Sequence, residues 1–239
     1  MKFTKLIPAT LCLTLIASPA LATNGAQEQL KASLTQASKA EKLPNAKSVV
    51  VFGGSESVVL TDNPRWVIKG QLYDMWQNTE INSKSQLHDA AKKIPIQTIN
   101  VNTTDVVDIR VNPEKSEVLT VFLDPFLEHS ANEMYLLNKY AADYQIRYIF
   151  TAMSQSNIKP FFSFACETQT LSTDQVIEKV ADKQFAYGKR KCREVQVMNS
   201  FGLTQFLHIK ESPTLIAPND VFHVGMPTEL LGWLRKNTK

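Results

Sequence analysis

The distribution of apolar and polar positions in the first half of the chain favours short strands. Three runs rich in valine and isoleucine lie at residues 48–52, 57–61 and 65–69. Gly53-Gly54 separates the first two runs, and Asp62-Asn63-Pro64 separates the last two, and both are typical turn sequences. β-Branched runs divided by turns predict an antiparallel meander. Because so small a sheet buries little apolar surface, we expect it to dimerise or to pack against another part of the protein.

The pattern changes after residue 117 to alternating strands and helices. Residues 118–123 form a continuous apolar run, which is typical of a strand that is buried on both faces. Residues 131–144 place apolar side chains on one helical stripe, and residues 146–152 supply a second strand. A strand, a helix and a strand in this order predict a βαβ unit.

The remaining elements complete a recognisable order. Residues 154–195 predict a mainly helical insertion, and a helix follows over 197–207. Two short strands, over 214–217 and 221–224, precede a terminal helix over 229–236. The thioredoxin fold has this order of elements: a strand–helix–strand unit, an insertion, and then a helix, two strands and a last helix. The predicted class is therefore α/β (α+β overall), with a thioredoxin-like C-terminal domain that a small antiparallel-sheet domain precedes.

Two helices and a connection are predicted between these parts. Residues 25–42 carry Ala, Leu, Gln and Lys with weak periodicity, which suggests a surface helix, and residues 83–93 predict another. A strand over 106–111 is predicted where the second domain starts. The expected organisation is a signal peptide over 1–22, a dimerisation domain over 23–93, a linker over 94–117 and the thioredoxin-like domain over 118–239.

The N-terminus predicts export. Lys2 and Lys5 precede an apolar run over 6–16, and Ala20-Leu21-Ala22 is a small-x-small cleavage site. A membrane anchor needs about 20 apolar residues, and this run is shorter. We expect cleavage after Ala22, a periplasmic location and no membrane insertion of the mature chain.

Charge argues against one class of partner. The chain has 26 Lys and Arg against 23 Asp and Glu, and cleavage after residue 22 would remove only two lysines. Basic and acidic residues are interspersed, and the short cluster Lys189-Arg190-Lys191 is explained by a solvated helix face. We therefore predict no binding to nucleic acid.

The cysteines suggest a disulfide. Cys12 lies in the predicted signal peptide, which leaves Cys166 and Cys192 in a compartment that permits disulfide formation. A bond between them would stabilise the fold by roughly 3 kcal/mol on the chain-entropy model. The alternatives are a metal site, which would need further ligands, and two free thiols.

Specific motifs resemble a known family. The segment Ile68-Lys69-Gly70-Gln71-Leu72-Tyr73-Asp74 and the opening Val121-Phe122-Leu123-Asp124-Pro125 are similar to the periplasmic protein-disulfide isomerases of the DsbC/DsbG type. Family members place C-x-x-C directly after that opening. Leu127 and Ser130 stand at those two positions here. Leucine cannot attack a disulfide and a serine hydroxyl stays protonated, so the resemblance implies a divergent member with no catalytic residues.

The same resemblance implies further features. In the family a second, non-catalytic disulfide bridges the helical insertion, and Cys166 and Cys192 match it. A cis-proline loop faces the redox site, and Ser212-Pro213 resembles that loop. The resemblance also implies a homodimer with an apolar cleft for unfolded polypeptides. We expect Phe126, Leu127, Ser212 and Pro213 to be the peptide-binding residues.

The turn Glu128-His129-Ser130 suggests two other chemistries. One is a hydrolytic pair of His129 and Ser130, and the other is a metal site at Glu128 and His129. Neighbouring residues on a helical turn point in different directions, and no G-x-S-x-G motif is present. A metal needs three or four converging ligands. We therefore predict no cofactor and no metal, and we expect Glu128 to stabilise the start of the helix.

Three functional hypotheses remain. The first, which we favour, is a non-catalytic protein that binds polypeptide clients or one dedicated periplasmic partner. It would act as a chaperone or assembly factor, and the 70–76 segment suggests the branch associated with conjugative transfer. The second is an isomerase-related role in periplasmic thiol–disulfide exchange, which Leu127 argues against. The third is a structural subunit of an envelope complex.

Overall fold

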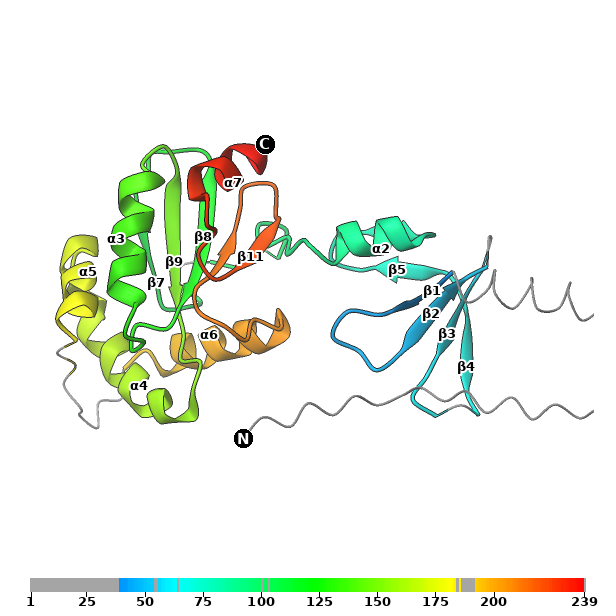
Figure 1. Cartoon of the computed structure of the whole chain (residues 1–239). Coiled ribbons are helices and arrows are strands. Elements are labelled where there is room, and N and C mark those ends of the chain that lie inside the picture. The colour runs from blue at the N-terminus through cyan, green and yellow to red at the C-terminus, as the bar shows by residue number, and fades with distance from the viewer. Residues whose placement is uncertain are drawn as a thin grey trace, which may run out of the picture.

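The computed structural model describes residues 39–53, 56–63, 65–99, 101–102, 104–183, 185 and 192–238. The predicted signal peptide over 1–22, the cluster over 189–191 and most of the helix predicted over 25–42 lie outside these residues. Figure 1 shows two parts, a small N-terminal sheet with one helix and a larger C-terminal sheet with its helices. None of the helices in the described part of the chain is long and apolar enough to cross a membrane.

The N-terminal sheet is the predicted meander with one additional strand. Its antiparallel order is β1 (Ala40–Lys42), β2 (Val49–Phe52), β3 (Ser57–Leu60) and β4 (Val67–Gly70). The prediction of a helix reaching residue 42 is wrong at this end, because the 40–42 segment pairs with β2. Backbone pairing thus overrides the weak helical periodicity of this segment.

A hairpin and a short helix complete the N-terminal part. The hairpin consists of β5 (Leu72–Asp74) and β6 (Thr79–Ile81), which pair antiparallel. The helix α2 (Lys84–Ala90) starts where the Ser83 side chain accepts a hydrogen bond from the backbone N–H of Gln86. A small core forms here from four buried side chains: Val50, Phe52, Ile81 and Leu87.

The C-terminal sheet has five strands in the order β11-β10-β8-β9-β7. Its centre is the parallel pair β8 (Val118–Leu123) and β9 (Gln145–Phe150), and the other three pairings are antiparallel. The flanking strands are β10 (Thr214–Ile216), β11 (Phe222–Val224) and β7 (Asp108–Val111). This topology and the helices around it confirm the predicted thioredoxin-like domain.

The helices follow the predicted order. The helix α3 (Ser130–Tyr140) joins β8 to β9, and the insertion contains α4 (Ile158–Glu167) and α5 (Thr173–Asp182). The last two helices are α6 (Glu194–Phe206) and α7 (Leu230–Lys236). Ser172 and Gln175 form a capping box that starts α5.

Both faces of the C-terminal sheet are covered, which explains the continuous apolar run in β8. Alternate residues Leu119, Val121 and Leu123 belong to the core that the helices cover, whereas Phe122 points into a second core on the opposite face. Burial on both faces thus leaves Thr120 as the single polar residue of this strand, whereas a half-exposed strand would alternate apolar and polar residues.

The segment predicted as a linker is packed against the second core. Ile94, Ile96 and Val106 are buried there with Phe122 and Ile149. The same segment also touches the edge of the sheet, because Lys93 forms an isolated antiparallel bridge with Val221, and the N–H of Phe222 donates to the carbonyl of Lys92 over 3.0 Å. β7, at the end of the segment, is itself a strand of this sheet.

Candidate functional site

The turn between β8 and α3 is the place where the family resemblance puts redox chemistry. Leu127 is partly buried in this turn, and Ser130 is fully buried at the first residue of α3. The Ser130 hydroxyl donates a hydrogen bond of 2.6 Å to the backbone carbonyl of Asp124. This hydrogen bond holds the turn together. Among the contacts described, no basic side chain accepts a hydrogen bond from the Ser130 hydroxyl.

Asp124 is the centre of this site, and its residue is fully buried at the end of β8. Its carboxylate accepts hydrogen bonds from three donors: Phe126 N at 3.0 Å, Met153 N at 2.8 Å and Asn157 Nδ2 at 3.1 Å. Three donors satisfy a buried carboxylate and compensate for its loss of solvation. The side chain thus joins the turn after β8 to the segment that leads from β9 into α4.

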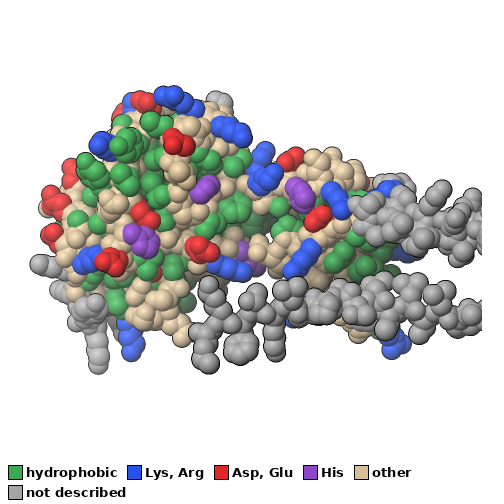
Figure 2. Space-filling view, viewed as in Figure 1, with side chains coloured by type: hydrophobic (Ala, Val, Ile, Leu, Met, Phe, Trp, Pro, Cys, Tyr) green, Lys and Arg blue, Asp and Glu red, His purple; other side chains and the backbone are tan. Residues whose placement is uncertain are grey.

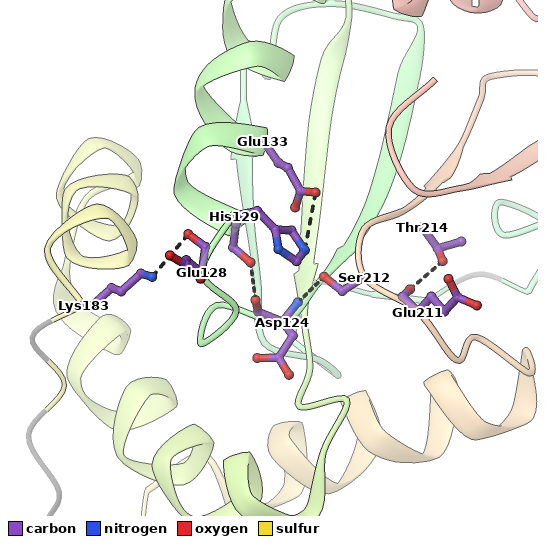
Figure 3. A network of polar contacts seen from close by, with 9 residues as sticks. Asp124, Glu128, His129, Glu133, Lys183, Glu211, Ser212 and Thr214 are labelled. Atoms are coloured by element: carbon purple, nitrogen blue, oxygen red, sulfur yellow. Dashed lines mark hydrogen bonds and ion pairs between the residues drawn. The ribbon is translucent and has the colours of Figure 1, made fainter. Parts of the chain in front are cut away.

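The backbone of Asp124 extends the same network to the proline loop. Its N–H donates to Ser212 Oγ over 2.9 Å, as Figure 3 shows. The Ser212–Pro213 peptide bond is cis, in agreement with the resemblance. On either side of the bond, the Thr214 hydroxyl donates to the Glu211 carbonyl over 2.7 Å. Leu127, Ser130 and the proline loop are therefore assembled around one buried residue.

Phe126, one of the four residues predicted to bind peptides, packs against the helical insertion. Its ring makes edge-to-face contacts with Phe164 and Phe185, at centroid distances of 6.1 and 4.8 Å. These contacts tie the turn to the helical insertion, and the ring is half-buried. Its principal role in the described structure is packing, and its contact with peptides stays a prediction.

The start of α3 contains a buried acid. Glu133 lies 3.6 Å from His129 (Oε1 to Nε2), while its Oε2 is buried and has no hydrogen-bond partner among the described residues. Burial raises the pKa of the Glu133 carboxyl above its usual range, and the nearby His129 offsets part of that shift. Within the described ranges no group of three or more His, Cys, Asp or Glu side chains could hold a metal ion.

We expect the Glu133→Gln substitution to stabilise the protein near neutral pH. Since the folded-state pKa lies above the unfolded value of 4.5, the stability that proton binding contributes is complete below that value and is lost as the pH rises through the folded pKa. Glutamine cannot ionise and avoids this loss. The free energy of unfolding of the variant should exceed that of the unchanged protein at about pH 7, and the excess should shrink toward about pH 4.

Urea unfolding at both pH values measures this difference. Glu114→Gln is the matched control, because Glu114 is exposed and its substitution should change stability little at either pH. A Glu133→Gln effect of equal size at both pH values would show that ionisation is not its cause.

Both cysteines in the described residues form one disulfide. Cys166, in α4, is bonded to Cys192, which precedes α6, and their Cα atoms lie 5.3 Å apart. The bond confirms the predicted disulfide, to which a metal site and two free thiols were the alternatives. Within the described residues, no free thiol remains to replace the cysteines that Leu127 and Ser130 exclude.

A cavity of about 610 Å³ lies between the N-terminal and C-terminal parts. Apolar side chains from both parts line it, with Leu72, Trp76 and Leu87 on one side and Ile209 and Phe222 on the other. Figure 2 shows hydrophobic side chains along this junction, with Lys and His side chains around them. The residues that flank the proline loop, Glu211 and Thr214, also line the cavity.

One aromatic contact involves Trp76, which lines this cavity. The Trp76 and Phe206 rings are 5.5 Å apart between centroids, which joins the loop between β5 and β6 to the end of α6. The cavity therefore depends on both parts of the chain. The sequence predicts the proline loop, but it predicts neither this cavity nor the role of Asp124.

Comparison with known proteins gives distant likenesses. No protein-family model and no curated protein matches the chain. A disulfide interchange protein from Neisseria gonorrhoeae is similar with a TM-score of 0.47 and 17% identity, over 57% of this chain and 98% of that one. Helicobacter pylori DsbG is similar with a TM-score of 0.39 and 14% identity, over 77% of this chain and 97% of that one. The catalytic domain of Proteus mirabilis ScsC is similar with a TM-score of 0.39 and 15% identity, over 56% of this chain and 90% of that one.

Proposed function

We propose that the protein is exported to the periplasm and binds extended polypeptide segments without exchanging disulfides. The observation that carries this proposal is the apolar cavity that Glu211 and Thr214, on either side of the Ser212–Pro213 peptide, help to line. Leu127 and Ser130, which stand at the redox positions, do not line this cavity. The export rests on the sequence of residues 1–22. In this proposal the protein binds polypeptides, whereas a thiol oxidoreductase exchanges disulfides with them.

The chemistry of the site supports the absence of exchange. Thiol–disulfide exchange requires a thiolate that attacks a sulfur and a second thiol that resolves the mixed disulfide. Leu127 has no nucleophilic atom, and the Ser130 hydroxyl is committed to the Asp124 carbonyl. Cys166 and Cys192 are bonded to each other within the insertion. No pair of groups at this site can therefore carry the reaction.

The chemistry of the cavity supports polypeptide binding. Its apolar lining would remove side chains of an unfolded segment from water, at about 25 cal/mol for each Å² of apolar surface buried. Lys93, Lys210, Asp74 and Glu211 line the same cavity and offer both signs of charge to the polar groups of such a segment. A mixed rim of this kind tolerates many sequences, because no single charge dominates.

Site-specific photocrosslinking in cells tests this proposal. A photoreactive amino acid at Lys210, which is exposed and lines the cavity, should form adducts with other polypeptides. The same probe at Lys236, which is exposed on α7, is the matched control. Many adducts at Lys210 support a general chaperone, and one discrete adduct supports a dedicated partner such as a component of a conjugative-transfer system. Equal labelling at both positions, or none at either, contradicts the proposal.

A second copy of the chain is the partner we propose for the edge of the N-terminal sheet. β4 is an edge strand, and the apolar side chains of Trp66, Val67 and Ile68 are exposed along it. An apolar edge strand left open to water is a site for pairing with another strand. Pairing of two such edges would bury this surface and form a homodimer.

We expect Ile68→Asp to convert this dimer into a monomer. Ile68 is 61% exposed in the single chain, so the substitution should not disturb the fold, but two carboxylates would face each other across a symmetric interface. Light scattering coupled to size-exclusion chromatography measures the mass. Val195→Asp, at a 69% exposed position on α6, should remain dimeric. A dimeric Ile68→Asp variant would place the interface elsewhere.

A further inference from the structure

A second cavity, of about 370 Å³, lies at the other end of the C-terminal sheet and shares no lining residue with the apolar cavity. It forms where residues 96–97 and 101–102 pass the strands β7, β8 and β9. Polar side chains dominate its lining, and six of them carry the argument: Asn102, Arg110, Ser116, Thr120, Gln145 and Arg147.

The register of the strands brings two arginines together. Arg110 on β7 pairs directly with Arg147 on β9, and Arg147 pairs with Thr120 on β8. Residues directly opposite each other on neighbouring strands project from the same face of a sheet. Like charges in such positions repel each other, so the arrangement needs an anionic group nearby.

The protein supplies only part of that negative charge. Asp108 Oδ2 accepts a hydrogen bond of 2.8 Å from Arg147 Nε. Arg110 forms no close ion pair within the contacts described, although the Asp108 carboxylate also attracts its charge, and the residues that line the cavity include no Asp or Glu. The two guanidinium groups therefore keep an excess of positive charge at the cavity.

Arg147 carries a charge that the described contacts leave partly unsatisfied. The residue is 8% exposed, and its Nη2 is buried without a hydrogen-bond partner among the described residues. A buried charged donor without an acceptor costs about 1–3 kcal/mol or more, and a small shift of the side chain toward an oxyanion in the cavity would remove that cost. Thr120 and Gln145, which are also buried, add a hydroxyl and an amide group to the same cavity.

We propose that this cavity binds the carboxylate or phosphate group of a small molecule, with the oxyanion held between Arg110 and Arg147. Guanidinium groups bind either oxyanion through paired hydrogen bonds. The apolar side chains of Ile96 and Val118 at the same cavity would contact the remainder of the molecule. This function is independent of the proposed polypeptide binding, since the two cavities are separate.

Isothermal titration calorimetry of the mature protein tests the site. Inorganic phosphate and succinate are the two probes, at constant ionic strength, and the tighter of the two identifies the preferred oxyanion. Arg110→Gln removes one charged donor from an exposed position, so the fold should persist, and its affinity should fall about tenfold or more. Arg235→Gln, at an exposed position on α7, is the matched control and should bind like the unchanged protein.

A second measurement locates the ligand. The side-chain Nε resonance of Arg147 in a ¹⁵N NMR spectrum should shift as the tighter probe saturates the unchanged protein, and it should not shift with glucose, a neutral probe. The proposal is overturned if neither anion gives saturable binding. It is also overturned if Arg110→Gln binds as tightly as the unchanged protein, or if Arg147 does not respond at saturation.

Discussion

Replacing both Leu127 and Ser130 by cysteine is expected to confer thiol–disulfide exchange activity. Leu127 lies in the turn before α3 and Ser130 is the first residue of this helix, where the exposed backbone N–H groups and the helix dipole stabilise a thiolate. A free cysteine of pKa about 8.5 is roughly 3% thiolate at about pH 7, and a pKa lowered to about 7 raises that fraction to about half. Because Leu127 is the less buried of the two, its replacement should attack, and the cysteine at Ser130 should resolve the mixed disulfide.

Reduction of insulin by dithiothreitol measures this activity. The double variant should exceed the rate without protein, whereas the unchanged chain should not. Leu127→Cys and Ser130→Cys, each made alone, are the matched controls and should not sustain turnover, since each lacks a partner thiol. Activity in the unchanged chain would disprove the non-catalytic hypothesis. An inactive double variant that still forms the new disulfide would show that the surroundings of the turn have also lost their redox function.

Asp124→Ala is expected to lower the free energy of unfolding by about 4–5 kcal/mol. The substitution leaves three donors without their acceptor, and buried donors without partners cost about 1–3 kcal/mol each. Those donors are Phe126 N, Met153 N and Asn157 Nδ2. Asp124→Asn keeps one carbonyl oxygen as an acceptor and should lose about half as much. Chemical denaturation followed by circular dichroism measures both variants.

Asp143→Ala is the matched control for this prediction. Asp143 is exposed, so its loss should change stability by less than about 0.5 kcal/mol. The hydrogen bond to Ser212 comes from the backbone N–H of Asp124, which alanine keeps, so the substitution tests the carboxylate alone. If Asp124→Ala were as stable as Asp143→Ala, the carboxylate would not be what fixes the turn after β8 to the segment before α4.

The parts of the fold that follow from local pattern are predictable from the sequence. The run over 118–123 predicts β8 with the bounds of the structure, because four of its six residues, Leu119, Val121, Phe122 and Leu123, belong to one of two cores. The disulfide is also predictable, because only Cys166 and Cys192 lie outside the predicted signal peptide. The thioredoxin-like order follows from the alternation of strands and helices alone.

Other features depend on contacts between distant segments, which a single sequence does not reveal. Ala40–Lys42 has helical composition but pairs with β2. The hairpin of β5 and β6 is not predicted, because its strands of three residues are too short to show a polarity pattern. Asp124 stands in the recognised Asp-Pro motif, yet its partners Met153 and Asn157 are about 30 positions further along the chain. Both cavities combine segments from different elements in the same way.

The edge of the C-terminal sheet at β11 has a consequence for self-association. This strand is three residues long, and the chain's own Lys92 already accepts the Phe222 N–H. Another strand could add only a few backbone hydrogen bonds there, each worth about 0.5–1.5 kcal/mol. Short and partly covered edges resist the edge-to-edge stacking that begins fibril formation. This edge of the C-terminal sheet therefore offers another chain little to pair with, in contrast to the exposed edge at β4.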